Sequence, residues 1–421
     1  MESTVAFVGM THLGLISAVA AAEKGFKVVC FDPDIALINT LKKSEPVISE
    51  PQLIELMYKN NERLHFSSDP KIIQTCALIY VAPDVSTDDQ GNSDLSAINQ
   101  LLSIVFENTS KKNVIVVLSQ VTPGFTRDKL QDDKTLYYQV ETLIFGRAIN
   151  RALLPERFIV GCQNPKDPLP EHYLQFLEAH NCPILPMRYE SAELAKISIN
   201  MCLVASVATA NTLAELCEEI GADWGEIVPA LKLDRRIGEY SYLSPGLGIS
   251  GGNLERDLAT VINYANQYDT DGSVVKAWIC NSQRRKNWIW TILKRIGVEK
   301  RDVKRIGILG LTYKENTHSL KNSPALVLLS QLEGWNVIAY DPVAALNAAP
   351  NYVTRANSVL EVLKGAEILV LSTAWPEFSL ISMSMLLENM SGRIVIDPYG
   401  ILLDLDLRAN GFNYFKLGMP S

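Results

Sequence analysis

A short strand that runs into a glycine turn, a helix and a second strand ending in Asp-Pro occurs at both ends of this chain. Near the N-terminus, residues 4–9 read TVAFVG, a helical segment follows, and the next strand reads KVVCFDPD. Near the C-terminus, RIGILGL leads to the helical SPALVLLSQLEG and then to the strand NVIAYDP. Further apolar strands continue each unit, at 77–82 and 113–119 in the first and at 367–373 and 393–398 in the second. Strands that alternate with helices predict an α/β fold with two Rossmann-like, doubly wound parallel sheets.

Between these two units, from about Glu190 to Arg295, the strand pattern disappears. Residues 191–221 keep a helical period of 3.6 residues and are apolar around most of the circumference. They predict a long buried helix that joins the two sheet domains and packs either within the chain or against its copy in a dimer. We therefore expect three regions, a dinucleotide-binding domain at 1–189, a helical dimerisation region with a substrate loop at 190–298, and a second Rossmann-like domain at 299–421.

Length and charge exclude several classes of protein. The 421 residues are enough for two to four domains at roughly 100–200 residues each. With 39 Lys and Arg against 47 Asp and Glu, the chain lacks the basic surface that binds a nucleic-acid backbone. The start, MESTVAFVGM, has no basic leader, and no uninterrupted apolar run approaches about 18 residues, so we expect a cytoplasmic protein without a membrane segment. Seven cysteines without CxxC spacing predict reduced thiols in the core and neither a disulfide framework nor a metal site.

The first glycine turn, Gly9-Met-Thr-His-Leu-Gly14, is a GxGxxG fingerprint with its middle glycine replaced by Thr11. Gly9 is suited to the tight turn and Gly14 to close helix–strand packing, whereas Thr11 places a side chain where the backbone normally approaches a pyrophosphate. Dinucleotide binding is then either weakened or adjusted, with the hydroxyl donating to a phosphate. Asp32, at the end of the second strand, is placed to accept from a ribose diol, which favours NAD over NADP.

Two later segments carry polar groups in apolar or glycine-rich surroundings. Glu193, Lys196 and Asn200 occur on the long helix, and Lys196 and Asn200 share one face. They indicate either a site facing a cleft or an exposed lysine beside a structural asparagine. The segment LDRRIGEYSYLSPGLGISGGNLERDL follows at 233–258. Its many glycines and the nearby Arg235 and Arg236 favour a loop that wraps a phosphate or sugar, and the alternative is an irregular connection.

In this order the segments resemble the UDP-glucose/GDP-mannose 6-dehydrogenase family of nucleotide-sugar dehydrogenases over essentially the whole chain. The segments that carry the resemblance are VAFVGMTHLGL, GNSDLS, SQVTPGFT, VETLIFGRAI, AELAKISIN, LDRRIG, the glycine loop, GLTYKENTHSLKNSPAL, YDP and TAWPEF. The resemblance implies a homodimeric cytoplasmic enzyme of polysaccharide biosynthesis that oxidises the CH2OH group of a nucleotide sugar twice with NAD. In that family a cysteine thiolate traps the intermediate aldehyde.

The glycine loop departs from the family at the position of that cysteine. The family loop reads roughly Gly-x-Gly-Tyr-Gly-Gly-Ser-Cys-Phe-Pro-Lys-Asp, and Gly248 and Asp257 set its register here. The position of the cysteine is then Asn253, whose carboxamide cannot act as a thiolate nucleophile. We expect the four-electron route through a thioester to be lost and a two-electron oxidation to remain possible.

The resemblance also implies roles for other residues. Glu141 matches the base of the family, Lys196 and Asn200 match its oxyanion pair, and Asp257 matches the acid beside the nucleophile. The implied substrate contacts are Arg236, Tyr242, Gly248 and Lys314. The implied cofactor contacts are Gly9, Thr11, His12, Leu13, Gly14, Asp32, Gln120 and Lys321. Three positions depart from the family pattern, with Gln120 for a threonine, Phe145 for a second acid and Lys321 for an arginine.

Three functions remain open from the sequence. The first is an NAD-dependent nucleotide-sugar oxidoreductase that acts on a UDP-hexose or a close relative with altered, two-electron chemistry. The second is a catalytically silent relative that binds NAD and nucleotide sugar in a regulatory or scaffolding role. The third is an NAD-dependent dehydrogenase whose substrate is not a nucleotide sugar.

Overall fold

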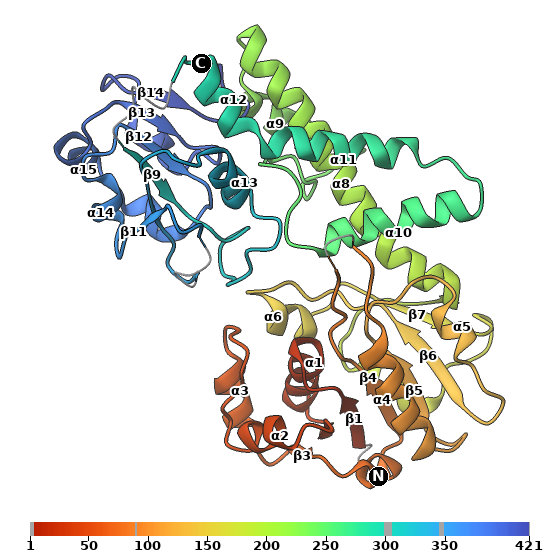
Figure 1. Cartoon of the computed structure of the whole chain (residues 1–421). Helices are drawn as coiled ribbons and strands as arrows, with labels where there is room; N and C mark the ends of the chain where they lie inside the picture. Colours follow the sequence, from red (N-terminus) through yellow and green to blue (C-terminus); the bar gives the residue numbers. More distant parts are fainter. Residues whose placement is uncertain (1–3, 89–90, 299–304, 345–348, 421) are drawn as a thin grey trace. The chain divides into compact units, whose positions relative to one another are not determined.

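A computed structural model describes residues 4–88, 91–298, 305–344 and 349–420. The chain divides into two compact units, Met1–Ile199 and Asn200–Ser421, and each contains one sheet (Figure 1). The two α/β sheets expected from the repeated strand and turn pattern are therefore present.

The first unit is built on an eight-stranded sheet. Its strand order is β3-β2-β1-β4-β5-β6-β7-β8, and every neighbouring pair is parallel except β6 with β7. The strands are β1 (Thr4–Val8), β2 (Lys27–Phe31), β3 (Leu64–Ser67), β4 (Leu78–Val81), β5 (Val114–Val117), β6 (Thr135–Gln139), β7 (Phe158–Cys162) and β8 (Ile184–Arg188). The order of strands reverses at β1, which lies between β2 and β4, and ligands bind at such a switch point in open α/β sheets.

Both faces of this sheet are covered by apolar side chains. Val5 and Phe7 of β1 belong to the core on one face, and Ala6 and Val8 belong to the core on the other, as expected for alternating side chains. The first core includes α1 (His12–Glu23), α2 (Ile35–Leu41), α3 (Leu53–Lys59), α6 (Ala148–Leu153) and α7 (Glu171–Glu178). The second includes the 3-10 helix η1 (Pro70–Thr75), α4 (Ser96–Glu107), α5 (Phe125–Asp128) and the start of α8 (Tyr189–Ile220).

The second unit contains a six-stranded, all-parallel sheet of order β11-β10-β9-β12-β13-β14. Its strands are β9 (Ile306–Leu309), β10 (Val337–Tyr340), β11 (Thr354–Arg355), β12 (Ile368–Leu371), β13 (Ile394–Ile396) and β14 (Asn413–Phe415). The helices of this domain are α13 (Pro324–Gln331), α14 (Val359–Leu363), η3 (Pro376–Leu380), α15 (Met383–Asn389) and η4 (Leu403–Leu405).

The turns after β1 and β9 have the same geometry. Gly9 and Gly310 adopt φ of +95° and +94°, a left-handed conformation that L side chains rarely adopt. The N–H of the residue after each glycine donates to an aspartate that ends the neighbouring strand, at 2.7 Å to Asp32 and 2.6 Å to Asp341. The aspartate of each Asp-Pro therefore has the same role in both sheets: its carboxylate accepts from the backbone of the glycine turn and holds it in place.

The helix α8 differs from the sequence expectation in its burial. It is helical over 32 residues, but only 33% of its most apolar stretch is buried within the chain. Its exposed apolar residues are Leu194, Leu213, Leu216 and Ile220. The prediction of a buried helix was wrong for the single chain, because periodicity identifies apolar residues and not what covers them. By length and composition alone, α8 is also long and apolar enough to cross a membrane.

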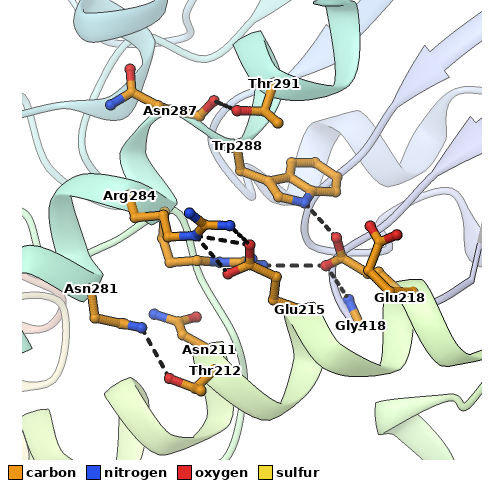
Figure 2. A network of polar contacts seen from close by, with 12 residues as sticks. Asn211, Thr212, Glu215, Glu218, Asn281, Arg284, Asn287, Trp288, Thr291 and Gly418 are labelled. Atoms are coloured by element: carbon orange, nitrogen blue, oxygen red, sulfur yellow. Dashed lines mark hydrogen bonds and ion pairs between the residues drawn. The ribbon is translucent and has the colours of Figure 1, made fainter. Parts of the chain in front are cut away.

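The remaining helices of the second unit are α9 (Trp224–Leu233), α10 (Asn253–Gln267), α11 (Ser273–Lys286) and α12 (Trp288–Arg295). A polar network ties α11 and α12 to α8 and to the C-terminal segment, and Figure 2 shows its contacts with Trp288 and Gly418. Glu218 of α8 accepts from Trp288 Nε1 at 2.8 Å, from Gly418 N at 2.9 Å and from Arg285 Nη2 at 3.3 Å. The Arg285 side chain is only 1% exposed. This carboxylate therefore connects three segments through buried contacts.

Candidate cofactor and active site

The first glycine turn has the close packing that a dinucleotide fingerprint requires. A Cβ on Gly9 would lie 2.9 Å from Pro83 N, and a Cβ on Gly14 would lie 1.8 Å from the Gly9 carbonyl oxygen. Both positions therefore require glycine. Asp32 is buried, and its two carboxylate oxygens accept from the N–H groups of Met10 and Asp34 at 2.7 and 2.9 Å.

These residues fit an NAD site at the carboxyl end of β1. Gly9 makes the tight turn that packs against Pro83, and Asp32 follows the neighbouring strand, where an acid receives a ribose diol. The N–H groups at the start of α1 are the donors that a pyrophosphate needs. One feature opposes simple binding, since a side chain of the chain itself already accepts from those N–H groups.

That side chain is Asp84, which follows β4. Its Oδ2 accepts from His12 N at 2.9 Å, and its Oδ1 accepts from Leu13 N at 3.3 Å. The hydroxyl oxygen of Thr11 accepts from Asp84 N at 2.7 Å. The residue that replaces the middle glycine therefore anchors the backbone of Asp84 through its hydroxyl oxygen. Donation from this hydroxyl to a phosphate, one of the alternatives left open by the sequence, stays a prediction.

His12 contributes its backbone to the turn while its ring faces the protein. Its Nε2 lies 3.4 Å from Glu50 Oε2, and the ring contacts Phe145 with centroids 4.3 Å apart. Glu50 also accepts from the N–H groups of Gly146 and Ala148 at 3.1 and 2.8 Å. Phe145, which stands where the family has a second acid, packs on the His12 ring and thereby supports the turn.

Lys196 and Glu141 form a close ion pair in the first unit. Lys196 Nζ lies 2.7 Å from Glu141 Oε1 and also donates to the Glu141 carbonyl oxygen at 3.0 Å. The side chains are only 13% and 17% exposed, so water screens the pair less than it would at a surface. The amide of Leu143 donates to Glu141 Oε2 at 2.9 Å and orients the carboxylate. These contacts restrict the side-chain conformations of Lys196 and Glu141.

Glu193, the third polar residue noted on this helix, has a structural role. It is fully buried and accepts from Gly124 N at 2.6 Å and from Thr126 N at 2.9 Å. Burial raises the pKa of its carboxyl group. These contacts hold the short helix α5, so Glu193 is not needed to explain any chemistry.

In the second unit, Asn200 and Asp257 form a corresponding polar pair. Asn200 Nδ2 donates to Asp257 Oδ2 at 2.5 Å, and Arg256 Nε lies 3.3 Å from Asp257 Oδ1. Asp257 is 1% exposed and Asn200 is 9% exposed. The buried carboxylate therefore fixes the orientation of the Asn200 carboxamide.

The glycine loop before α10 packs closely against neighbouring segments of the second unit. Gly248 has φ of +81°, and a Cβ there would lie 2.5 Å from the carbonyl oxygen of Ser282 on α11. A Cβ on Gly251 would lie 2.8 Å from the Tyr313 ring, and Gly251 N donates to the Lys321 carbonyl oxygen at 3.1 Å. The loop ends at Asn253, an exposed residue that begins α10.

The other residues that the resemblance implies lie on surfaces or loops of their own units. Arg236 is exposed and donates to Asp234 through Nε at 3.0 Å and Nη2 at 2.6 Å. Tyr242 is 51% exposed. The ammonium of Lys314 lies 5.8 Å from the centroid of the Tyr313 ring. Gln120 and Lys321 are both half-buried, and their proposed cofactor contacts remain predictions.

The buried cysteines are poor candidates for a thiolate nucleophile. All seven are free, and Cys30, Cys76, Cys162 and Cys217 are buried. Burial raises the pKa of the Cys76 thiol to about 11 and raises that of Cys30 further, which disfavours the thiolate. Cys202 and Cys280 are exposed, which the expectation of core thiols did not anticipate. Among the residues that the structure describes, no group of three His, Cys, Asp or Glu side chains is placed to hold a metal ion.

Two doubly wound sheets, of which the first ends in a dinucleotide turn with an acid at its side, define a dinucleotide-binding α/β protein of the dehydrogenase class. Three family models match the chain: the UDP-glucose/GDP-mannose dehydrogenase family NAD binding domain at 3–174, the central domain at 190–283 and the UDP binding domain at 307–404. The chain belongs to the UDP-glucose/GDP-mannose dehydrogenase family, and its N-terminal domain is the NAD-binding domain of that family.

Curated relatives align over almost the whole chain. The UDP-glucose 6-dehydrogenase TuaD of Bacillus subtilis is 28% identical over 435 residues, which cover 99% of this chain and 93% of the relative. The UDP-glucose 6-dehydrogenase of Rhizobium meliloti is 28% identical and covers 99% of each chain. Helix α8 lies almost entirely within the segment matched by the central domain of the family.

Solved structures share the fold. A UDP-glucose dehydrogenase from Pyrobaculum islandicum superposes with a TM-score of 0.84 at 22% identity, covering 100% of this chain and 98% of that one. A UDP-D-ManNAc dehydrogenase from Pyrococcus horikoshii gives 0.83 at 20% identity, with 99% of each chain covered. At these identities the similarity establishes the fold and not the substrate.

The sequence analysis missed Asp84 and Glu50. A signal for Asp84 was available, because it closely follows a buried strand and parallel neighbouring strands end at the same edge of a sheet. Glu50 lies in the connection between α2 and α3, with no local pattern that links it to His12 or to the N–H groups near residue 147. Only the tertiary structure identifies its partners.

Proposed function

We propose that this chain is an NAD-dependent nucleotide-sugar oxidoreductase that acts on a UDP-hexose or a close relative and removes two electrons per turnover. The observation that carries this proposal is the Lys196–Glu141 pair at 2.7 Å, which remains in place although Asn253 stands where the family has its thiol. The printed names of the relatives, UDP-glucose 6-dehydrogenases, support the substrate class. From the same family relationship we propose that the protein acts in polysaccharide biosynthesis in the cytoplasm.

The residues of the chain suit the oxidation of an alcohol to an aldehyde. The carbinol loses a hydride from carbon and a proton from oxygen, and NAD supplies the hydride acceptor. Lys196 already donates to a carboxylate and a carbonyl, so we assign it as a donor to the developing oxyanion and Glu141 as the proton acceptor. Asn200, oriented by Asp257, is the second group that positions the oxygen.

The absence of a thiol at position 253 limits the chemistry after the aldehyde forms. A carboxamide does not form a thiohemiacetal, so no covalent adduct presents a second hydride for transfer. We therefore expect the aldehyde, formed with one NADH, as the product of the native chain.

The test is mass spectrometry of the sugar together with NADH absorbance, for the native chain and for Asn253→Cys. The native chain is expected to give an aldehyde with one NADH, and Asn253→Cys is expected to produce some carboxylate. Carboxylate from the native chain would contradict the two-electron proposal. Binding of NAD and sugar without any turnover would contradict the enzyme proposal and support the silent, regulatory relative.

We further propose that the chain is a homodimer through the exposed apolar face of α8. Leu213, Leu216 and Ile220 lie on one face of the helix and are 39%, 51% and 65% exposed. Leu216→Glu is expected to convert a dimer to a monomer in sedimentation velocity, because it places a charge in an apolar interface. Leu360→Glu on α14, where the leucine is 49% exposed, is the matched control and should leave the dimer intact. A dimer that survives Leu216→Glu unchanged would contradict this interface.

A further inference from the structure

We propose that Asp84 is an internal occupant of the pyrophosphate site: its carboxylate takes the N–H donors that a dinucleotide needs, and NAD binds only as this side chain leaves them. The proposal rests on the NAD-binding part of the function and not on any redox step. It predicts that Asp84 lowers the affinity of the chain for its own cofactor.

The contacts of Asp84 place an anion at the start of α1. His12 and Leu13 are the first two residues of this helix, and their N–H groups donate to the two carboxylate oxygens at 2.9 and 3.3 Å. The helix has 12 residues, most of them buried, and its own first turn contains no acidic residue. The positive end of the helix dipole is thus matched by a carboxylate that comes from the loop after β4.

Thr11 makes this arrangement stable. Its hydroxyl oxygen accepts from Asp84 N at 2.7 Å, so the backbone of Asp84 is held while the side chain turns toward the helix. A glycine at position 11 could not provide this acceptor. The replacement of the middle glycine and the presence of Asp84 are therefore two parts of one arrangement.

The carboxylate and a pyrophosphate exclude one another. Both are anions that need the same N–H donors, and their charges repel at that distance. Asp84 is exposed as a whole residue, while burial of its carboxyl group raises the pKa of that group. Rotation of this short side chain toward solvent would free the donors. The carboxylate acts as a helix cap in the free chain, and the cofactor has to replace that cap.

The test is isothermal titration of NAD into the full-length chain and its Asp84→Ala and Asp84→Asn variants, without a sugar. Loss of a competing cap is expected to tighten NAD binding about tenfold in Asp84→Ala. Asp84→Asn keeps an acceptor but removes the charge, so its affinity should lie between the two. Inorganic pyrophosphate, titrated as a probe of the N–H donors alone, should show the same order.

Asp69→Ala is the matched control. Asp69 caps η1 in the same unit by accepting from Lys71 N at 3.0 Å, and its loss should leave NAD affinity unchanged. Unchanged or weaker NAD binding by a folded Asp84→Ala chain would overturn the proposal. If that variant does not fold, the Asn variant decides, because it preserves the size of the side chain. No turnover is measured, so a failure of the proposed oxidation would leave this result intact.

Discussion

Replacing Lys196 with Met is expected to lower kcat for NADH formation from a nucleotide sugar about 100- to 1,000-fold, with little change in the Kd for NAD. The ammonium is held by Glu141 at 2.7 Å and by a backbone carbonyl at 3.0 Å, so it is positioned before the substrate binds. A preorganised donor stabilises an oxyanion without the reorganisation that water would need. Methionine keeps most of the length of the side chain and removes the charge.

The matched control is Lys59→Met. Lys59 forms an ion pair of similar length with Glu23, at 2.6 Å, but its side chain is 62% exposed. Its loss should change neither kcat nor stability by more than a small amount. If Lys196→Met retains most of its activity, Lys196 does not stabilise the oxyanion and the proposed roles of Lys196 and Glu141 are wrong. Circular dichroism and the Kd for NAD separate this outcome from misfolding.

Replacing Glu218 with Leu is expected to lower the free energy of unfolding by about 3–5 kcal/mol. The Glu218 side chain is 7% exposed and accepts from Trp288 and Gly418 (Figure 2). It also accepts from Arg285. Leucine would leave three buried donors without this acceptor. Arg285 would keep only its longer contact with Glu215, at 3.4 Å, and a buried guanidinium that loses one of its carboxylates is costly.

The neighbouring Glu219 provides the control for this variant. Its side chain is 60% exposed and pairs with Arg295 at 2.7 Å, so Glu219→Leu should cost less than about 1 kcal/mol. Urea unfolding followed by circular dichroism measures both variants against the native chain. Equal, small losses in the two variants would show that the buried network contributes no more than a surface ion pair.

Much of the fold follows from local patterns in the sequence. The apolar runs that end in glycine or Asp-Pro became β1, β2, β9 and β10, because a strand buried on both faces needs a continuous apolar segment. The segment 191–221 lies in the single helix α8 up to Ile220, for an equally local reason, its unbroken 3.6-residue period. The similar turns at Gly9 and Gly310 were evident as a repeat before their hydrogen bonds were known.

The contacts within the candidate site could not be predicted from local sequence patterns. The shared helical face of Lys196 and Asn200 is visible in the spacing, but their partners lie 55 and 57 residues away along the chain. The family resemblance identified Glu141 and Asp257 as site residues. It did not indicate that Glu141 pairs with Lys196 or that Asp257 accepts from Asn200. Asp84 did not belong to any recognised motif, although its place after β4 brought it to the turn after β1.

The sequence by itself determined the two sheets, the long helix and the kinship of the chain, because period, turn residues and motif order are properties of neighbouring residues. The tertiary structure alone decided that α8 is largely uncovered in the single chain and that Asp84, whose backbone N–H donates to Thr11, accepts from the first N–H groups of α1. Burial and hydrogen-bond partners depend on which distant segments meet. An apolar or charged residue therefore reveals its role only once its neighbours in space are known.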